Sequence, residues 1–423
     1  MAQRKKPQPR AAARAVAGSK RQPLPQAKRE EAAPSFDTWR QRLEEAYANE
    51  AAVKEEIQAQ AARFTEMLKV LGTPMIDGPM VHFVYSDSAA RQVAVTGEFT
   101  QWAGAALPMA QIGDSGIFHA TREFPKPTRV EYKLVVDGKW IEDPLCPNQV
   151  DNGVGGRNSY FVVGDFTEPP ELEERRGVPK GRVDEFDFTS KLLNNVRRVY
   201  VYLPATYQRN SKQRYPVLYV HDGGEYLSRA KLNVVLDNLA YGSEIPELIA
   251  VMVDPIDRVR EYHANEDYAR FVEQELLPHI DHNYRTLTEP GARAVMGASL
   301  GGLISVYLGL TRPQLFSKVG GQSSALMIEG GRLAELANHL ATPLAFYFDV
   351  GEYEPSFIPG HKQLVPLLEA RGSRCFYQMV PGGHNWTSWR AHLKDLLTFL
   401  WPREPAGVKT RRKTVGVQDA GSN

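Results

Sequence analysis

The first regular pattern along the chain is helical and covers residues 36–72. Charged and amide side chains separate apolar ones that recur every three or four positions: Phe36, Trp39, Leu43, Ala46, Tyr47, Phe64, Met67, Leu68 and Leu71. This spacing predicts an amphipathic helix or a helical hairpin. We expect its apolar face to pack on a neighbouring domain or on a second copy of the chain, which makes a homo-oligomer one candidate assembly.

The period of the apolar positions changes to two at Val81. Turn residues such as Asp137-Gly138 separate short β-branched and aromatic runs, which span residues 81–85, 92–98, 117–123, 130–136, 139–142 and 159–163. This alternation predicts half-buried strands joined by tight turns. We therefore expect a small immunoglobulin-like β-sandwich over residues 78–165, followed by a Pro- and Glu-rich linker at residues 166–180.

A third pattern begins near residue 181 and continues to residue 402. Apolar runs typical of buried strands occur at residues 198–203, 216–221, 248–253, 292–296, 318–322, 344–350 and 375–380. Helical stretches alternate with them at residues 268–279, 303–310, 361–370 and 389–400. This alternation predicts a largely parallel sheet with helices on both faces. The expected fold class is therefore α/β, with a β-sandwich preceding the larger sheet.

The formal net charge of +1 conceals two basic ends. Residues 1–29 carry nine Lys and Arg and no Asp or Glu, and residues 403–423 carry five basic and two acidic residues. The rest of the chain holds 37 of the 51 basic and 48 of the 50 acidic residues, a net charge of −11. We expect residues 1–35 and 403–423 to be disordered, solvated tails. Nucleic acid is a disfavoured partner, because its recognition needs a coherent basic face.

Targeting and cysteine signals are weak. The chain has no run of about 18 apolar residues, so we expect no membrane-spanning helix. Its first thirty residues lack the apolar core of a secretory signal peptide, and the expected location is cytoplasmic. Cys146 and Cys375 fall in different predicted domains, which indicates neither a disulfide framework nor a cysteine-based metal site.

One motif in the third region carries nucleophile chemistry. Residues 297–301 read Gly-Ala-Ser-Leu-Gly, between a predicted strand and a predicted helix. In a G-x-S-x-G elbow, small residues allow the sharp turn that presents the serine hydroxyl above a sheet. Ser299 is therefore the candidate nucleophile, and the amide of Leu300 is the candidate first donor to an oxyanion. The alternative interpretation is a glycine-rich structural turn.

The candidate base lies 85 residues further along the chain. His384 stands in Pro-Gly-Gly-His-Asn-Trp, directly after the last predicted strand and before a helix, where an α/β-hydrolase carries its histidine. The third member should be an acid between Ser299 and His384, on the loop after the preceding strand. Glu354 is the first choice, Glu352 the second and Asp349 the third; a Ser-His pair without an acid stays open.

A second oxyanion donor should follow an early strand of the sheet. The strand at residues 216–221 runs into Asp222-Gly223-Gly224, and glycines allow a backbone amide to approach a substrate oxygen closely. Gly224 and Gly223 are the candidates. The alternative is an ordinary tight turn.

These motifs together resemble the enterochelin esterases and the related esterase-D-type family, which includes feruloyl and acetyl-xylan esterases. The resemblance covers about residues 181–402 and rests on Val199–Pro204, His221–Gly224, Arg258–Glu261, Glu275–Pro278, Gly297–Gly301 and Gly382–Trp386. It implies an α/β-hydrolase sheet with flanking helices. It also implies that Arg258, Arg260 and Trp386 contact the substrate, the arginines suiting an anionic catecholate. The alternative for the arginines is an ion pair with Glu261 or another acid.

Residues 81–163 resemble a second family, the early-set domains of carbohydrate-binding module family 48. The matching stretches are Gly97–Trp102, Glu131–Lys133, Val136–Trp140, Asp143-Pro144 and Asn158-Ser159. By this resemblance Trp102 and Trp140 would stack on sugar rings, while Lys133 and Asn158 would bond sugar hydroxyls. The alternative is a packing module whose tryptophans are structural.

The expected function is that of a serine carboxylic-ester hydrolase that forms an acyl-enzyme and needs no metal or organic cofactor. A catecholate siderophore ester of the enterochelin type leads as the small-molecule substrate. A feruloyl or acetyl ester on a carbohydrate is the alternative. A hypothesis of another class is a glycan-binding protein whose esterase domain is vestigial.

Overall fold

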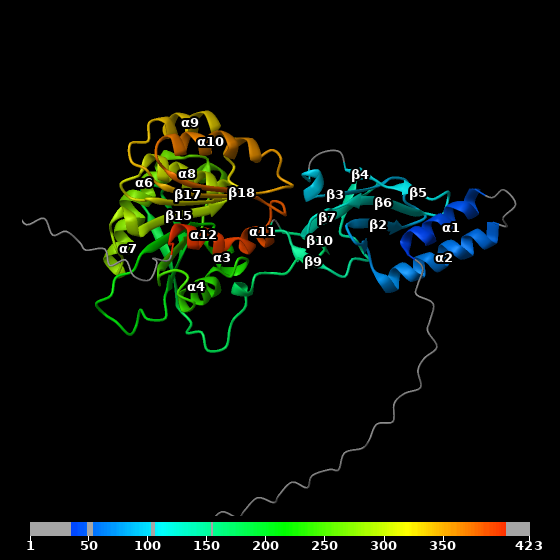
Figure 1. Cartoon of the computed structure of the whole chain (residues 1–423), viewed down its shortest axis with the longest axis horizontal. Helices are drawn as coiled ribbons and strands as arrows, with labels where there is room; N and C mark the ends of the chain where they lie inside the picture. Colours follow the sequence, from blue (N-terminus) through cyan, green and yellow to red (C-terminus); the bar gives the residue numbers. More distant parts are fainter. Residues whose placement is uncertain (1–34, 49–53, 103–105, 154, 403–423) are drawn as a thin grey trace, which may run out of the picture.

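The computed structural model describes residues 35–48, 54–102, 106–153 and 155–402. The chain forms two lobes side by side along the longest axis of the molecule (Figure 1). The N-terminal lobe carries two helices at its outer end, and the C-terminal lobe contains the large sheet. The tails predicted at residues 1–35 and 403–423 lie outside the described residues, apart from Ser35.

Two helices open the described chain, α1 (Phe36–Ala48) and α2 (Lys54–Leu71). Their apolar faces meet β-strands of the same lobe in a buried cluster of Phe36, Leu43, Ala61, Phe64, Leu68, Val84, Ile112 and Ile117. The helical spacing of the apolar residues is the reason that one face of each helix is buried. Of the two packing partners considered, the neighbouring domain is therefore the one observed.

The N-terminal lobe contains two antiparallel sheets. The first has the strand order β1 (Met75–Asp77), β2 (Met80–Ser86), β6 (Ile117–Glu123) and β5 (Ala110–Gln111). The second has the order β4 (Leu107–Pro108), β3 (Val93–Gly97), β7 (Thr128–Val136), β10 (Arg157–Val163) and β9 (Gln149–Asp151), with β8 (Lys139–Ile141) pairing β7. Asp137 and Gly138 both have positive φ, which is the geometry that a two-residue hairpin turn requires.

The C-terminal lobe is built on an eight-stranded sheet. Its order is β11 (Arg182–Ser190), β12 (Asn195–Leu203), β14 (Ile249–Val253), β13 (Val217–His221), β15 (Arg293–Ala298), β16 (Lys318–Gln322), β17 (Ala345–Gly351) and β18 (Arg374–Val380). Strands β14 to β18 of this order run parallel, while β11 and β12 add antiparallel strands at one edge. The predicted parallel strands are present. Strand β11 was not expected, because the consecutive acidic residues Asp184 and Glu185 interrupt its apolar alternation.

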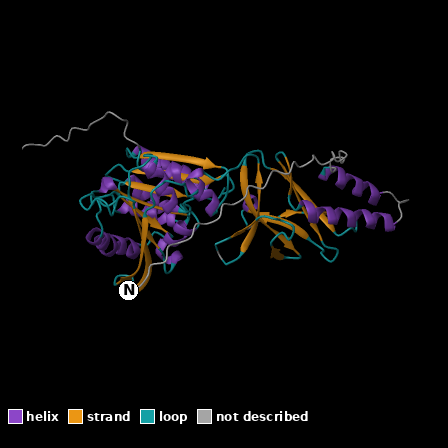
Figure 2. Ribbon diagram, turned by 90° about the horizontal axis from the view of Figure 1, so that it is seen from below, coloured by secondary structure: helices purple, strands orange, loops and turns teal. Residues whose placement is uncertain are grey.

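Helices cover both faces of this sheet (Figure 2). One face carries α5 (Arg258–Tyr262), α6 (Glu266–Phe271), α7 (Leu277–Asn283), α8 (Leu300–Thr311), α9 (Gly330–Asn338) and α10 (Ile358–Ala370). The other carries α3 (Gly223–Ser228), α4 (Leu232–Tyr241), α11 (Trp386–Ala391) and α12 (Leu393–Leu400). A hydrophobic core lies on each face of the sheet. Along β13, Val217 and Tyr219 point into one core, and Leu218 and Val220 point into the other, so the continuous apolar run contributes to both cores.

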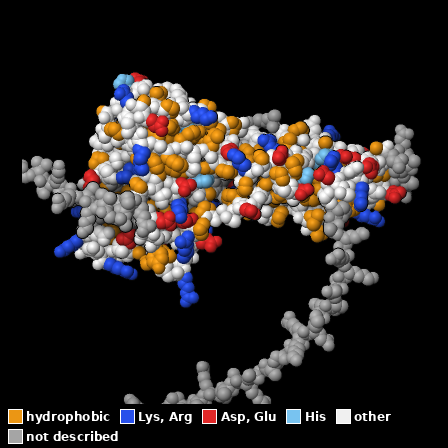
Figure 3. Space-filling view, in the orientation of Figure 1, with side chains coloured by type: hydrophobic (Ala, Val, Ile, Leu, Met, Phe, Trp, Pro, Cys, Tyr) orange, Lys and Arg blue, Asp and Glu red, His pale blue; other side chains and the backbone are white. Residues whose placement is uncertain are grey.

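Side chains of the two lobes contact each other directly. Lys126 pairs with Glu352, and Asp151 pairs with Arg229, which follows α3. The ring of Phe124 lies 6.1 Å from the ring of Tyr353. Within the described part of the face in Figure 3, basic and acidic side chains are interspersed, so this face offers no broad basic surface. No helix of the described chain has both the length and the apolar character to cross a bilayer.

Candidate active site

Ser299 lies at a sharp turn between β15 and α8, with φ 58° and ψ −121°. A Cβ on Gly297 would come within 2.5 Å of the backbone of Gly301, which only a glycine avoids. A Cβ on Gly301 would lie 3.0 Å from Oδ2 of Asp222. The glycines of the motif are therefore explained by close packing around a strained serine, as a nucleophile elbow requires.

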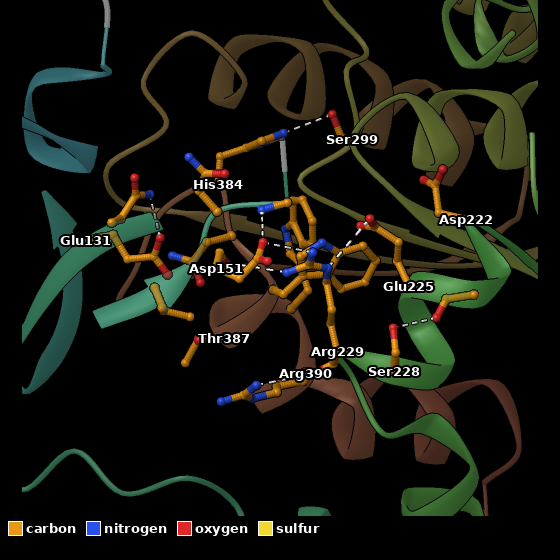
Figure 4. A pocket seen from close by; sticks show the side chains of 18 of the residues that line it. Glu131, Asp151, Asp222, Glu225, Ser228, Arg229, Ser299, His384, Thr387 and Arg390 are labelled. Carbon is orange, nitrogen blue, oxygen red and sulfur yellow. Dashed lines mark hydrogen bonds and ion pairs between the residues drawn. The ribbon is translucent and has the colours of Figure 1, made fainter. Parts of the chain in front are cut away.

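His384 faces this serine from the loop between β18 and α11. Its Nε2 lies 2.9 Å from Oγ of Ser299 (Figure 4). The imidazole packs against two aromatic rings, with centroid distances of 4.7 Å to Phe357 and 5.0 Å to Trp389. These contacts restrict the ring, so the hydrogen bond to the serine is preorganised.

Glu354 holds the other side of the imidazole. His384 Nδ1 lies 2.6 Å from Oε1 of Glu354, a side chain that is nearly fully buried. The second carboxylate oxygen of Glu354 accepts hydrogen bonds from the amide of Gly351 and from Oγ of Ser323 at 2.7 Å. Trp389 Nε1 donates to that same Ser323 oxygen, so the acid is fixed by a network.

The other two candidate acids lie elsewhere. Glu352 pairs with Lys126 of the N-terminal lobe, and Asp349 accepts a hydrogen bond from Gln322 Nε2. A carboxylate facing Nδ1 favours the imidazole tautomer with its proton there, which leaves Nε2 free to accept the proton of a hydroxyl. The geometry brings together a hydroxyl, an imidazole and an acid in the order that nucleophilic catalysis uses.

The three candidate oxyanion donors differ in their surroundings. Leu300 begins α8, and the amide of a first helical residue has no acceptor inside its helix. Gly223 begins α3, where a Cβ would come within 2.3 Å of the Met252 backbone. The amide of Gly224, in contrast, donates to Oδ1 of Asp254 at 2.7 Å. In this structure the Gly224 amide is therefore already hydrogen-bonded to the Asp254 carboxylate.

The three predicted substrate-contacting residues are not all at the site. Trp386 lines the cavity in front of Ser299. Arg258 also lines it, but its guanidinium makes two hydrogen bonds to the buried carboxylate of Asp222, at 2.8 and 2.9 Å. Arg260 is exposed and is absent from the described lining, which corrects the prediction for this residue. The ion-pair alternative thus holds for Arg258, with Asp222 as partner; Glu261 pairs with Arg197 instead.

A cavity of about 1270 Å³ lies between the lobes and contains Ser299 and His384 in its wall. The N-terminal lobe lines the same cavity with the four residues singled out for glycan contact, Trp102, Lys133, Trp140 and Asn158. The residues of the two sites that were predicted separately from the sequence therefore line one cavity, a relation that no local pattern indicated.

The four residues from the N-terminal lobe have different environments. The rings of Trp102 and Trp140 are stacked, with centroids 6.2 Å apart and planes inclined by 23°, and Trp140 is half exposed. Asn158 is buried, and its Nδ2 donates to Oε2 of Glu131 at 2.9 Å. The tryptophans present an aromatic surface, while Asn158 is occupied by an internal partner.

The charges of the cavity wall largely neutralise one another. The described lining has five Lys or Arg and six Asp or Glu side chains. Arg258 pairs with Asp222, Arg229 pairs with Asp151 and Glu225, and Arg390 pairs with Glu168 just outside the lining. Figure 4 shows Arg229 between the acidic side chains of Asp151 and Glu225. Such pairing reduces the field that an anionic ligand would meet.

Several residues at the site carried no catalytic signal in the sequence. Ser323 and Trp389 hold the acid, Asp254 occupies the Gly224 amide, and Glu98 reaches the histidine loop from the other lobe. Ser323 and Asp254 directly follow parallel strands, as Ser299 does. This position at the carboxyl end of a strand is the sequence signal that could have identified them.

Comparison with family models divides the chain in the same way. Residues 190–400 match the model described as "Putative esterase". Residues 80–167 match the model described as the glycogen recognition site of AMP-activated protein kinase.

Curated relatives include esterases of two kinds. The chain is 27% identical over 300 residues to the iron(III) enterobactin esterase of Escherichia coli K12, which covers 66% of this chain and 72% of that protein. It is 25% identical over 311 residues to the endo-1,4-beta-xylanase/feruloyl esterase of Xylanibacter ruminicola, which covers 68% of this chain and 40% of that protein.

Solved structures share the fold. The enterobactin esterase of Shigella flexneri superposes with a TM-score of 0.65 and 23% identity, over 76% of this chain and 92% of that one. The ferric enterobactin esterase of Salmonella typhimurium gives a TM-score of 0.65 and 22% identity, over 78% and 95%. The C-terminal lobe has the α/β-hydrolase fold of these enzymes. Over residues 190–400 the chain belongs to the esterase family, and it is a carboxylic ester hydrolase.

Proposed function

We propose that the chain hydrolyses its ester through an acyl-enzyme on Ser299. The observation that carries this proposal is the hydrogen-bonded series from Ser299 Oγ through the imidazole of His384 to the buried Glu354. A serine hydroxyl is a weak nucleophile until a neighbouring base removes its proton, and this series supplies that base together with the acid that orients it.

The reaction follows from the positions of these groups. Ser299 Oγ attacks the ester carbonyl while His384 Nε2 takes its proton, and Glu354 stabilises the resulting imidazolium. The amide of Leu300, with that of Gly223 or Gly224, stabilises the oxyanion; use of Gly224 requires Asp254 to release its amide. His384 then protonates the departing alcohol. A water molecule activated by His384 attacks the acyl-enzyme and releases the acid and the free serine.

A catecholate siderophore ester of the enterochelin type is the leading substrate class. The enterobactin esterases named above match 66% and 76% of this chain, which is more than its hydrolase lobe alone. The aromatic side chains of Trp102, Trp140 and Trp386 in the cavity wall suit planar catechol rings.

A feruloyl or acetyl ester on a carbohydrate is the second candidate, and a specific observation favours it. The stacked Trp102 and Trp140 share the cavity with the serine, so a sugar bound there would lie beside the reacting carbonyl. Ion pairing of Arg229, Arg258 and Arg390 also leaves less positive charge for a strongly anionic ligand. A vestigial esterase is disfavoured, because Ser299, His384 and Glu354 keep a complete hydrogen-bonded series.

We also propose how the chain is divided into domains. Residues 78–165 form an immunoglobulin-like module, joined by the linker at 166–180 to the hydrolase domain at 181–402, with residues 36–72 as a helical segment. The two antiparallel sheets of the N-terminal lobe support the module. We expect the module to contribute to substrate binding.

Hydrolysis assays test the proposal directly. Wild type and Ser299→Ala are assayed on p-nitrophenyl acetate and butyrate, with enterobactin in its ferric and iron-free forms, methyl ferulate and feruloylated oligosaccharides in parallel. The matched control is Ser317→Ala, at the opposite end of the sheet beside Pro290. Activity that Ser299→Ala loses and Ser317→Ala keeps supports the mechanism, and the preferred ester identifies the class. Equal activity in wild type and Ser299→Ala contradicts it.

A further inference from the structure

Glu98 is an acidic side chain that the mechanism above does not use. It begins the short helical turn Glu98–Thr100 after β3 in the N-terminal lobe. Its side chain is buried, yet it is part of the wall of the cavity that contains Ser299. A buried carboxylate is costly unless polar partners compensate it, so its hydrogen bonds indicate what it does.

Both oxygens of Glu98 are hydrogen-bond acceptors. Oε2 accepts from the amide of Glu131 at 2.9 Å, within the same lobe. Oε1 accepts from Nδ2 of Asn385, the residue that follows His384 in the other lobe. The orientation of the Asn385 amide is fixed independently, because its Oδ1 accepts from the amide of Ser388 at 2.9 Å and caps α11.

The same carboxylate also packs against the backbone of the histidine loop. A Cβ on Gly383 would lie 2.7 Å from Oε1 of Glu98, so the absence of a side chain at this position is what admits the carboxylate. Glu98 thus contacts the residues on both sides of His384, although it comes from a different lobe.

A second layer holds Glu98 in place. The side chain of Glu131 accepts hydrogen bonds from Arg129 Nη1 and Asn158 Nδ2, each at 2.9 Å. The guanidinium of Arg129 lies 3.8 Å from the ring centroid of Tyr160. The buried Asn158, which the sequence resemblance assigned to sugar hydroxyls, therefore belongs to this supporting layer.

We propose that Glu98 is a positioning residue that fixes the His384 loop from the N-terminal lobe, so that the imidazole stays between Ser299 and Glu354. The inference rests on the proposed role of His384 as the base. It gives the N-terminal lobe a part in catalysis that is separate from ligand binding. Loss of the contact would let the loop move, and small misplacements of a catalytic group lower the rate constant steeply.

The test exchanges the partners of one hydrogen bond. Glu98→Gln places an amide donor against the Asn385 donor or against the Glu131 amide, and Asn385→Asp places a second carboxylate against Glu98. The double variant Glu98→Gln with Asn385→Asp restores a donor and an acceptor in reversed order. Assays at about pH 9 keep Glu98 ionised, since burial and the nearby Glu131 raise its pKa to about 8.

We expect each single variant to lower kcat on p-nitrophenyl acetate roughly ten- to a hundredfold with little change in KM, and the double variant to recover most of the loss. Asn385→Ser, which keeps an N-cap but removes the amide donor, should lose activity like Glu98→Gln. The control is Lys126→Ala, which removes another contact between the lobes without touching the histidine loop, and it should keep the wild-type kcat.

Two outcomes overturn the proposal. One is wild-type kcat in Asn385→Ser and in both single variants; the other is a double variant no better than the poorer single variant. These results differ from failure of the proposed mechanism, because that failure is seen in Ser299→Ala retaining activity. If a variant at Glu98 does not fold, Asn385→Ser on the histidine loop still tests the same hydrogen bond from its other partner.

Discussion

His384 Nδ1 lies 2.6 Å from Oε1 of Glu354, a carboxylate that is buried and further held by Ser323 and the Gly351 amide. This hydrogen bond distinguishes Glu354 from Glu352, which lies only two residues earlier in the chain. Glu352 faces outward to Lys126, whereas Glu354 turns inward to the imidazole. Only one of them is placed to orient the proposed base.

Replacing Glu354 tests this distinction. In Glu354→Gln the amide oxygen would stay with the Gly351 N–H donor, so the NH2 group would face Nδ1 and favour the wrong imidazole tautomer. We expect kcat to fall roughly 10²- to 10⁴-fold. Glu352→Gln should retain activity, because it changes only a partly exposed ion pair with Lys126. The measurement is kcat on p-nitrophenyl acetate for both variants. Equal losses, or no loss in Glu354→Gln, would exclude Glu354 as the acid.

We expect the aromatic surface of Trp102 and Trp140 to affect the KM of large substrates without affecting kcat. Trp140→Ala removes half of the stacked pair, so KM for a feruloylated oligosaccharide or a catecholate ester should rise roughly tenfold, while turnover of p-nitrophenyl acetate stays unchanged. Tyr241→Ala is the control, since Tyr241 is an exposed aromatic residue at the end of α4. Unchanged KM for every large ester in Trp140→Ala would exclude the tryptophan surface from substrate binding.

Arg258 should behave as a structural residue. Its guanidinium compensates the buried carboxylate of Asp222, which packs against Gly301 of the elbow. Arg258→Ala leaves that carboxylate unpaired, and we expect the free energy of unfolding to fall by about 3 kcal/mol. Arg260→Ala, an exposed neighbour, should change it by less than about 0.5 kcal/mol. Urea denaturation measures both, and equal stability of the two variants would contradict the assignment.

Glu98 predicts a pH dependence of stability. Burial and Glu131 raise its pKa from 4.5 to about 8 in the folded protein. Between these two pKa values the folded chain holds a proton on Glu98 that the unfolded chain has released. The stabilisation that this proton provides is fully present below about pH 4.5 and is lost as the pH rises through about 8. The urea midpoint of wild type should therefore fall more between about pH 5 and pH 8 than that of Glu98→Gln. Parallel pH profiles would show that Glu98 does not titrate in this way.

Much of the hydrolase lobe could be predicted from local patterns. The continuous apolar runs of the parallel strands and the glycines at residues 297 and 301 reflect constraints that act within a few residues, burial on both faces of the sheet and close packing at the elbow. Strand β11 was missed because the consecutive acidic residues Asp184 and Glu185 separate Val183 from Phe186 and so break the period of two.

The composition of the site could be predicted only in part. Glu354 and Glu352 lie on a loop, where no period fixes the direction of a side chain, and burial decides between them. Trp102 and Glu98 join the site only because the two lobes pack together, and such contacts between distant segments leave no local trace. Arg260 matches a family motif, yet the motif does not determine which arginine of the short helix α5 faces the cavity. The cytoplasmic location stays a prediction.

Labelling of the serine tests the central claim most directly. Wild type, Ser299→Ala and His384→Ala are treated with diethyl p-nitrophenyl phosphate, a reagent that phosphorylates activated serines, and peptides are mapped by mass spectrometry. The account predicts one label per chain on Ser299 in wild type, loss of esterase activity in proportion to the label, and little or no label in either variant. An active enzyme that stays unlabelled at Ser299, or loses activity through a label elsewhere, would contradict it.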